Sequence, residues 1–360
     1  MAKVIDTVGL SRELIIHPGE TLSEVLDERG MSQRELAYRT GVSEKHISTV
    51  ISGQKNISAD FAKKLEYALG IEYSFWMNLQ TLYDRELIEY KEKNCITDKE
   101  LSVLDDLKEV TDIWASFNWI DDKQSPVDMI IDYRRLLRIS NLLDVPKMIT
   151  FNDNHFQDSS IQDPYVFFAW RRMCEMLTAD SSVSEEVSLN RLREKIPEIK
   201  QVMFMRSDRI GNELKKLFAE CGIIFMIVPS LDNLPVQGFI SNRTDGALVL
   251  CMCIKQKYAD VFWLTLFHEI AHILNGDVRR TYIDLYPDNE EREKDMDKIA
   301  FDYMIDSNEY KAFIESEKYK RTAEIEKFAR TQKIKDYMVK GRLSRELGMT
   351  WKERQGCKWV

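Results

Sequence analysis

Residues 262–277 read FWLTLFHEIAHILNGD and contain the motif His-Glu-x-x-His as His268, Glu269 and His272. The other positions are mostly apolar at helical spacing, which predicts a buried helix that ends at Gly276. Residues i and i+4 share one face of a helix, so both imidazoles can bind one metal ion with Glu269 beside them. Two neutral nitrogen ligands next to a carboxylate base are what a zinc hydrolase needs, and the stretch therefore predicts a Zn²⁺ site.

The other explanation of the motif is an amphipathic helix whose histidines only cap or hydrogen-bond. We give it less weight, because a histidine pair without a partner is costly on so apolar a helix.

A tetrahedral zinc site needs a third protein ligand and leaves the fourth position to water. The run NEEREKDMDKIAFDYMI at 289–305 predicts a second helix, with Glu293 and Asp297 four residues apart beside its apolar face. We predict Glu293 as the third ligand and Asp297 as the residue that holds a ligating histidine by its other ring nitrogen. Competing ligands in the same run are Glu290, Glu291 and Asp295. Acids near a helix N-terminus also suit a plain solvated helix start, which is the alternative.

The two predicted helices resemble the ImmA/IrrE family of metallopeptidases. The resemblance rests on FWLTLFHEIAHIL, on the E-x-x-x-D spacing of Glu293 and Asp297, and on KIAFDYMI at 298–305. Met296 stands where the family usually has Ala, and Ile299 where it usually has Phe. The resemblance implies a zinc-dependent endopeptidase fold, often one that acts on a repressor protein.

Length and composition indicate a globular protein of two or three domains, with 360 residues, 44% hydrophobic and 31% charged. There is no apolar run of about 18 residues, so no membrane span is expected. The N-terminus lacks a signal-peptide pattern, which predicts a cytoplasmic protein whose six scattered cysteines stay reduced. The formal net charge is −9, so nucleic-acid binding has to come from a local patch.

Near the N-terminus, helix-start and turn residues alternate at short spacing. Ser32-Gln-Arg-Glu is a capping box that opens one helix, Gly41 makes a turn, and Ser43 caps the next helix. Two short helices around a glycine-containing turn predict a helix-turn-helix.

The sequence SQRELAYRTGVSEKHISTVISGQKNISADFAKKLEYALGI at 32–71 resembles the XRE/HigA-type antitoxin family of helix-turn-helix regulators, with similarity over 15–84. The resemblance implies that the helix beginning at Ser43 enters the major groove of a double-stranded DNA operator. It implies that Gln33 and Arg34 contact phosphate or a base edge, and that Lys55 contacts phosphate. The residues of the groove helix expected to be exposed toward DNA are Ser43, Glu44, Lys45, His46, Ser48 and Thr49.

The local charge balance supports DNA binding only weakly, since residues 31–64 hold six basic and three acidic side chains. Few phosphate contacts per chain imply modest affinity, so we predict a homodimer on the operator. The alternative is a helical bundle that kept the fold and binds protein.

Strands are predicted at 223–228, 238–241 and 247–253, just before the metal helix. This order is typical of small zinc peptidases and also resembles the ImmA/IrrE family. The predicted fold is α+β and mostly helical, with a five-helix N-terminal helix-turn-helix domain (1–90), a helical middle (91–197) and a C-terminal zincin-like domain (198–360) with a small sheet.

The predicted function is a DNA-binding, antitoxin-like transcriptional regulator that carries a zinc peptidase cleaving a protein partner. One alternative is a non-proteolytic antitoxin or repressor whose C-terminal domain binds a toxin or ligand. Another is a ligand-sensing transcription factor. The predicted partners are operator DNA, a protein substrate or cognate toxin, and a second copy of the chain, with no membrane.

Overall fold

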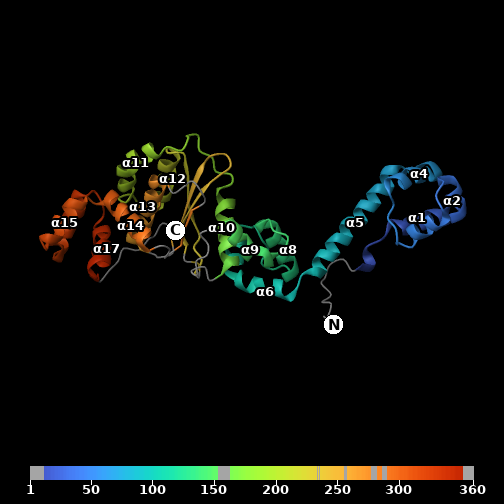
Figure 1. The fold of residues 1–360 in the computed structure, drawn as a ribbon, viewed down its shortest axis with the longest axis horizontal. Coiled ribbons are helices and arrows are strands. Elements are labelled where there is room, and N and C mark those ends of the chain that lie inside the picture. The colour runs from blue at the N-terminus through green and yellow to red at the C-terminus, as the bar shows by residue number, and fades with distance from the viewer. Residues whose placement is uncertain are drawn as a thin grey trace. The chain divides into compact units, whose positions relative to one another are not determined.

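The structure, a computed structural model, describes residues 12–152, 163–232, 234, 236–254, 258–276, 282–285 and 290–351 (Figure 1). Within these ranges the side chains of 13, 149–152, 237, 282–285 and 290–294 are not described. The chain forms two compact units. The N-terminal unit contains Met1–Leu101 and Ser125–Ile131, and the C-terminal unit contains Ser102–Gln124 and Asp132–Val360. The three predicted domain ranges stay predictions.

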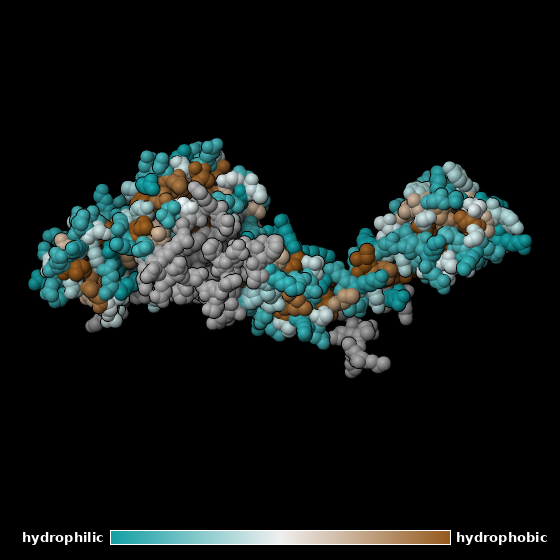
Figure 2. Space-filling view, viewed as in Figure 1, coloured by the Kyte–Doolittle hydropathy of each residue, from teal (hydrophilic) through white to brown (hydrophobic). Residues whose placement is uncertain are grey.

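The N-terminal unit contains the five predicted helices. After a 3₁₀ turn at Arg12–Leu14 they are α1 (Pro18–Glu28), α2 (Gln33–Thr40), α3 (Glu44–Ile51), α4 (Ala59–Leu69) and α5 (Tyr73–Cys95). Their apolar faces share one core, in which Leu22, Ile47, Phe61 and Trp76 are buried. Hydrophilic side chains cover most of the drawn face of these helices, with hydrophobic ones showing between them (Figure 2). The buried positions recur at the 3.6-residue spacing of an α-helix, so each helix turns one apolar face to this core.

The backbones of α1 and α3 approach each other closely, and this contact determines how the two helices pack. His17 caps α1, because its Nδ1 accepts the Gly19 amide at 2.9 Å. A Cβ on Gly19 would overlap the carbonyl of Val50 in α3, so only glycine allows this packing. On its other side the His17 ring meets the edge of Tyr83, with centroids 4.7 Å apart.

Helices also make up most of the C-terminal unit, and α6 (Asp98–Asp106) and α8 (Pro126–Leu137) are divided between the two units. The others are α7 (Lys108–Ser116), α9 (Val145–Asn152), α10 (Pro164–Thr178), α11 (Leu189–Val202), α12 (Ser207–Ala219), α13 (Ala259–Asn275), α14 (Glu290–Met304), α15 (Ser307–Glu315), α16 (Thr322–Thr331) and α17 (Asp336–Leu347), with 3₁₀ turns at Leu142–Asp144 and Lys318–Lys320. No helix among the described residues is both long enough and apolar enough to cross a bilayer.

One sheet runs through the C-terminal unit in the order β1-β3-β2-β4. Its strands are β1 (Ile223–Val228), β2 (Val236–Asn242), β3 (Leu248–Cys253) and β4 (Tyr282–Leu285). β1 and β3 are parallel, while β2 is antiparallel to both β3 and β4. The first three strands were predicted. The fourth was not, because four residues of mixed polarity carry no clear strand pattern.

Both faces of the sheet are covered by helices. Leu250 and Met252 of β3 face the core that the sheet shares with α11, α12 and α13. On the opposite face, the Trp170 ring of α10 meets Phe239 of β2 edge-on, and the buried thiol of Cys174 in α10 lies beside Cys251 of β3. Burial on both faces explains why β3 is apolar throughout rather than alternating. The five described cysteines form no disulfide.

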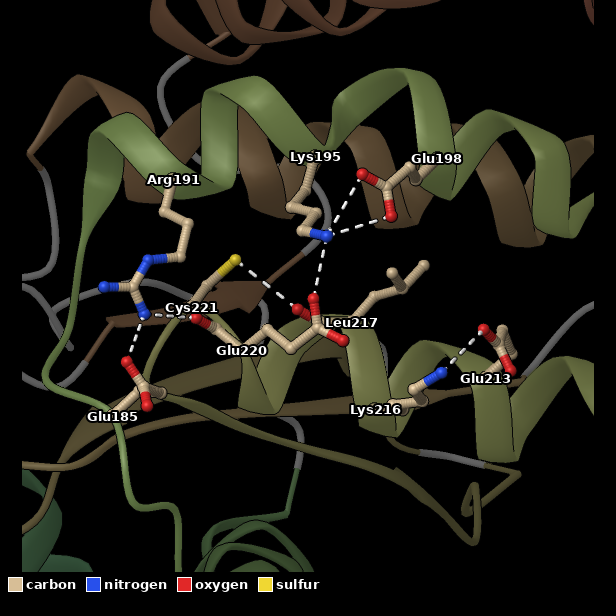
Figure 3. A network of polar contacts seen from close by, with 9 residues as sticks. All are labelled: Glu185, Arg191, Lys195, Glu198, Glu213, Lys216, Leu217, Glu220 and Cys221. Carbon is tan, nitrogen blue, oxygen red and sulfur yellow. Dashed lines mark hydrogen bonds and ion pairs between the residues drawn. The ribbon is translucent and has the colours of Figure 1, made fainter.

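An ionic network holds the outer surfaces of α11 and α12 together (Figure 3). Lys195 of α11 lies 2.9 Å from Glu198 and 2.7 Å from Glu220, which follows α12. Arg191, one turn earlier, pairs with Glu185 at 2.7 Å and donates to the Glu220 carbonyl at 2.6 Å. These contacts support the helix layer that covers the α13 side of the sheet.

Two glycines should respond in opposite ways to the same substitution. Gly19→Ala forces the α1 and α3 backbones apart, so we expect a loss of about 2 kcal/mol or more in unfolding free energy. Gly211→Ala places a methyl group in α12 at an ordinary 3.7 Å from Ile227, so we expect no loss and a gain of up to about 1 kcal/mol. Urea unfolding of the full chain measures both, and a tolerated Gly19→Ala would contradict the close packing.

Candidate metal centre and nucleic-acid interface

The His-Glu-x-x-His segment lies in α13, in which every residue from Phe262 to Leu274 is buried. His268 is 7% exposed, and Glu269 and His272 are fully buried. The helix ends as expected at Gly276, which has a left-handed φ of 82°. The three polar side chains are therefore held by a rigid, apolar element.

The two imidazoles point their Nε2 atoms at each other, 3.0 Å apart, with ring centroids 4.7 Å apart and planes at 64°. Two nitrogens at about 2.0–2.1 Å from a tetrahedral zinc ion are about 3.3 Å apart. The observed separation is close to that value. It also suits a direct hydrogen bond in which one imidazole donates and the other accepts.

Asp297 of α14 lies against the other ring nitrogen of His268, with Oδ1 3.0 Å from Nδ1. A carboxylate there favours the tautomer with the proton on Nδ1 and leaves the Nε2 lone pair directed at His272. The second oxygen, Oδ2, lies 3.3 Å from Nη1 of Arg345 in α17. Three helices that are distant in sequence thus contribute to one chain of polar contacts.

Glu269 lies against the sheet. A Cβ on Gly238 of β2 would overlap the Glu269 carboxylate, so glycine at this position makes room for it. This contact places the carboxylate between α13 and β2, one residue along the helix from His268.

The predicted third ligand, Glu293, belongs to α14, but its side chain lies outside the described residues, as do those of Glu290 and Glu291. Asp295 is described and is exposed. Among the side chains that the structure describes, no three of His, Cys, Asp and Glu are grouped closely enough to hold a metal ion. The identity of the third ligand stays a prediction.

The predicted nucleic-acid interface lies in α2, α3 and the turn between them. Ser32 caps α2 through the Glu35 amide, and Ser43 caps α3 through the His46 amide. Gly41 ends α2 with a left-handed φ of 68°. Ile47 and Val50 face the core, which turns the opposite side of α3 outward. The capping residues therefore set the start and the orientation of the helix predicted to enter the groove.

Exposure divides the predicted DNA-contacting residues into two groups. The exposed ones are Arg34, Ser43, Glu44, Lys45, Ser48 and Lys55. Gln33, His46 and Thr49 are half-buried, which corrects the expectation that His46 and Thr49 would be exposed. The His46 ring packs edge-on against Phe61, and Thr49 Oγ1 donates to the His46 carbonyl at 2.8 Å. Both side chains are thus partly engaged within the domain.

His46 also meets Lys55, whose Nζ lies 3.2 Å from its Nδ1. Burial first, and then the positive charges of Lys55 and Lys64, lower the pKa of His46. When His46 is neutral, its Nδ1 can accept a hydrogen bond from the ammonium group of Lys55. It adds no positive charge to this surface at neutral pH.

Ion pairs separate the six basic residues of 31–64 into two sets. Arg39, Lys63 and Lys64 each pair with an acid on their own helix, at Glu35, Glu66 and Asp60. For Arg34, Lys45 and Lys55 the described part of the chain provides no ion pair. Their positive charge is available to an anion, and all three are among the residues predicted to contact DNA.

Comparison with known proteins gives matches to the N-terminal helices. Residues 22–76 match the helix-turn-helix family model described as "Helix-turn-helix" (HTH_3). Virulence-associated protein I of Dichelobacter nodosus is 39% identical over 75 residues, which are 21% of this chain and 69% of that protein. The chain belongs to the XRE family of helix-turn-helix proteins.

Two further proteins are similar to a comparable share of this chain. The uncharacterized HTH-type transcriptional regulator YddM of Escherichia coli (strain K12) is 30% identical over 66 residues, 18% of this chain and 70% of that protein. A solved HigA-family addiction module antidote protein from Coxiella burnetii is 31% identical, with 23% of this chain and 95% of that chain covered and a TM-score of 0.21. Each of these matches covers less than a quarter of the chain.

Three residues around the two sites, Tyr38, Gly238 and Arg345, were not predicted from the sequence. In the XRE-family domain, Tyr38 is 76% exposed and has the Arg34 guanidinium 5.9 Å from its ring centre. An aromatic side chain on the polar face of α2 is the sequence signal that marks this residue. Gly238 and Arg345 had no local signal, because each meets α13 or α14 only through the tertiary fold.

The XRE-family domain should lose stability in mild acid. Burial, the largest cause, lowers the pKa of His17, although contacts with Asn56, Glu20 and Asp84 raise it. Below about pH 6.5 the unfolded chain therefore takes up this proton before the folded chain does, and folding free energy is lost as pH falls. Above that pH the residue contributes no pH dependence. Protection of α1 and α3 amides from hydrogen exchange should fall between pH 7.5 and 5.5.

His17→Asn provides the matched control, since asparagine keeps an acceptor for the Gly19 amide and does not titrate. We expect a shallower pH dependence in this variant, with the remainder coming from His46, whose pKa is also lowered. Parallel pH profiles in wild type and variant would contradict the assignment.

Proposed function

We propose that the chain is a DNA-binding, antitoxin-like transcriptional regulator whose C-terminal unit is a zinc-dependent peptidase acting on a protein partner. The regulator part is supported by the XRE-family domain and its three basic residues. The peptidase part is carried by one observation. The Nε2 atoms of His268 and His272 lie 3.0 Å apart, with Asp297 behind His268 and Glu269 beside the pair.

The donor set fits a zinc ion. Two imidazole nitrogens 3.0 Å apart match two of its tetrahedral positions, and neutral histidine with a carboxylate is a usual ligand set for a catalytic site. His268, His272 and the predicted Glu293 would hold the ion. Asp297 keeps His268 in the tautomer that a metal ligand requires.

Zinc bound there would lower the pKa of a water molecule and polarise a peptide carbonyl. The chain's own contribution comes from Glu269, whose carboxylate accepts a proton from the attacking water. The same group then delivers the proton to the leaving amine nitrogen, so the carboxylate is regenerated. Gly238 supports this role, because the absence of a side chain there leaves the space that the carboxylate occupies.

A second candidate function is a non-proteolytic regulator whose C-terminal unit binds a toxin or ligand. Full burial of Glu269 and His272 favours it, because a peptidase must bring water and substrate to these groups. A direct hydrogen bond between the two imidazoles would then satisfy the pair without metal.

DNA binding is proposed to use Arg34, Lys45 and Lys55, with Ser43, Glu44 and Ser48 facing the groove. Lysine and arginine contacts to phosphate position a helix-turn-helix, while the exposed residues of the groove helix read base edges. Half-buried His46, Thr49 and Gln33 are proposed as secondary contacts. We also propose a homodimer, since one copy offers few phosphate contacts.

The salt dependence of DNA binding distinguishes the two sets of basic residues. Each lost phosphate contact lowers the slope of log K against log salt by about 0.9. We expect Arg34→Ala and Lys55→Ala each to reduce the slope on duplex DNA by about 1 per chain. Fluorescence anisotropy at several salt concentrations measures it.

Lys64→Ala is the control, because Lys64 is paired with Asp60 at 2.8 Å. We expect its slope to match wild type. If Lys64→Ala reduced the slope as much as Arg34→Ala, ion pairing would not select the contacting residues, and this assignment would be wrong.

Glu269→Gln tests the peptidase. Glutamine nearly preserves shape but cannot accept the proton, so cleavage should fall about 100-fold or more while one zinc per chain is retained. A partner captured by the Glu269→Gln protein serves as substrate, with zinc measured by atomic emission. Cleavage by this variant at the wild-type rate would reject the role of Glu269.

Gly238→Ala gives an independent test of the same group. The new methyl group should displace the carboxylate without touching the imidazoles, so cleavage should fall while zinc content is unchanged. His268→Ala is the contrasting variant, expected to lose zinc. A wild-type chain that binds no zinc would favour the non-proteolytic regulator.

A further inference from the structure

Asp297 uses both carboxylate oxygens in contacts that join three helices. Oδ1 lies 3.0 Å from Nδ1 of His268 in α13, and Oδ2 lies 3.3 Å from Nη1 of Arg345 in α17. Arg345 is 48 residues from Asp297 along the chain, so only the docking of α17 brings it there.

We propose that Arg345 is a positioning residue of the metal centre: through Asp297 it holds His268 with Nε2 directed at His272, and it thereby couples the docking of α17 to metal binding. The inference rests on the proposed metal centre. It identifies α17 as the helix whose docking controls metal binding there.

The base of α17 is firmly seated, which gives Arg345 a defined position. Met338, Val339 and Leu343 are buried in the core of the C-terminal unit. A Cβ on Gly341 would come within 2.9 Å of Oδ2 of Asp260 in α13, so the glycine allows the two helices to pack closely. α17 therefore meets the metal helix directly as well as through Asp297.

Arg342 adds a second anchor. The Arg342 residue is only 8% exposed. Its guanidinium lies 3.8 Å from the ring centre of Tyr310 and 4.8 Å from the ring centre of Phe301. Its Nε donates a hydrogen bond to Glu346 at 2.8 Å. Phe301 belongs to α14, one turn beyond Asp297. Arg345 follows Arg342 by three residues and so reaches the same helix from a fixed base.

The Arg345–Asp297 pair contributes little to folding, because both side chains are nearly half exposed, at 45% and 41%. Its consequence lies in orientation. A carboxylate that is held on one oxygen by a guanidinium keeps the other oxygen in place for the imidazole. Loss of the arginine should therefore affect metal affinity more than stability.

Thermodynamic linkage requires the effect to be reciprocal. If docked α17 raises metal affinity through Arg345, bound metal must strengthen the docking of α17 by the same factor. The linkage provides a readout that does not depend on catalysis.

Zinc affinity of the full chain, measured by competition with a chromophoric chelator, is the first test. We expect Arg345→Ala to bind zinc about 3- to 10-fold more weakly. The effect should be smaller than the about 10- to 100-fold loss for Asp297→Ala, which removes the direct partner of a ligand. Arg345→Lys should recover most of the affinity, since it restores a cation beside Oδ2.

The matched control is Arg330→Ala on α16. Arg330 is also an arginine at the end of a helix, paired with Glu326 at 3.8 Å and 75% exposed. It should bind zinc as wild type does. Arg345→Ala with wild-type zinc affinity, while Asp297→Ala is weakened, would overturn the inference and leave the metal centre intact.

Hydrogen exchange of the amides of 336–347, with and without zinc, is the second test. Zinc should slow exchange there in wild type and in Arg330→Ala, and much less in Arg345→Ala. Equal slowing in all three proteins would overturn the coupling. A wild-type chain without zinc binding would reject the metal centre itself, whereas zinc binding without cleavage would reject only the peptidase.

Discussion

Burial of three polar side chains in an apolar helix is the constraint on which the C-terminal unit depends. A buried imidazole or carboxylate costs several kcal/mol unless it has partners, so the elements around α13 have to supply them. Asp297 of α14 contacts His268, and the two imidazoles contact each other. Gly238 of β2 has no side chain and so leaves room for the Glu269 carboxylate. Apolar residues alone would have packed the same helix at lower cost. The polar cluster therefore indicates a functional demand.

A different constraint shapes the N-terminal unit, where the backbone ends of short helices have to be satisfied. Ser32, Ser43 and Ser58 each cap a helix, and His17 caps α1. The three serine caps set the residues at which α2, α3 and α4 begin. The close contact between Gly19 and the Val50 carbonyl sets how α1 packs against α3. The outward face of α3 is the one opposite Ile47 and Val50, which are buried in the core.

The sequence predicted those helices whose apolar spacing and capping residues lie within a short segment. The apolar spacing of 262–274 and the caps at Ser32 and Ser43 gave α13, α2 and α3 correctly, and the apolar positions of 289–305 gave α14. The contact between Asp297 and His268 spans 29 residues and could be named only through the logic of metal ligation. The fourth strand, the parallel pairing of β1 with β3, and the approach of Gly238 and Arg345 depend on tertiary packing, which a short window does not contain.

The half-buried state of His46 and Thr49 has the same origin. On a helical wheel both lie toward the polar side of α3, but Phe61 of α4 reaches the His46 ring and Lys55 folds back onto it. Exposure at such positions is decided by the neighbouring helix, and α3 alone does not reveal it.

The small number of phosphate contacts available to one copy of the chain is the argument for the proposed homodimer on an operator. Arg34, Lys45 and Lys55 can neutralise three phosphates, which corresponds to a salt slope of about −2.7. A net charge of −9 means that the rest of the chain adds repulsion instead of attraction at long range. Pairing two copies doubles the contacts to a slope of about −5.4, and it lets two groove helices read two half-sites at once. The small number of cations without an ion pair in the described part of each domain therefore supports the proposed two-fold assembly on DNA.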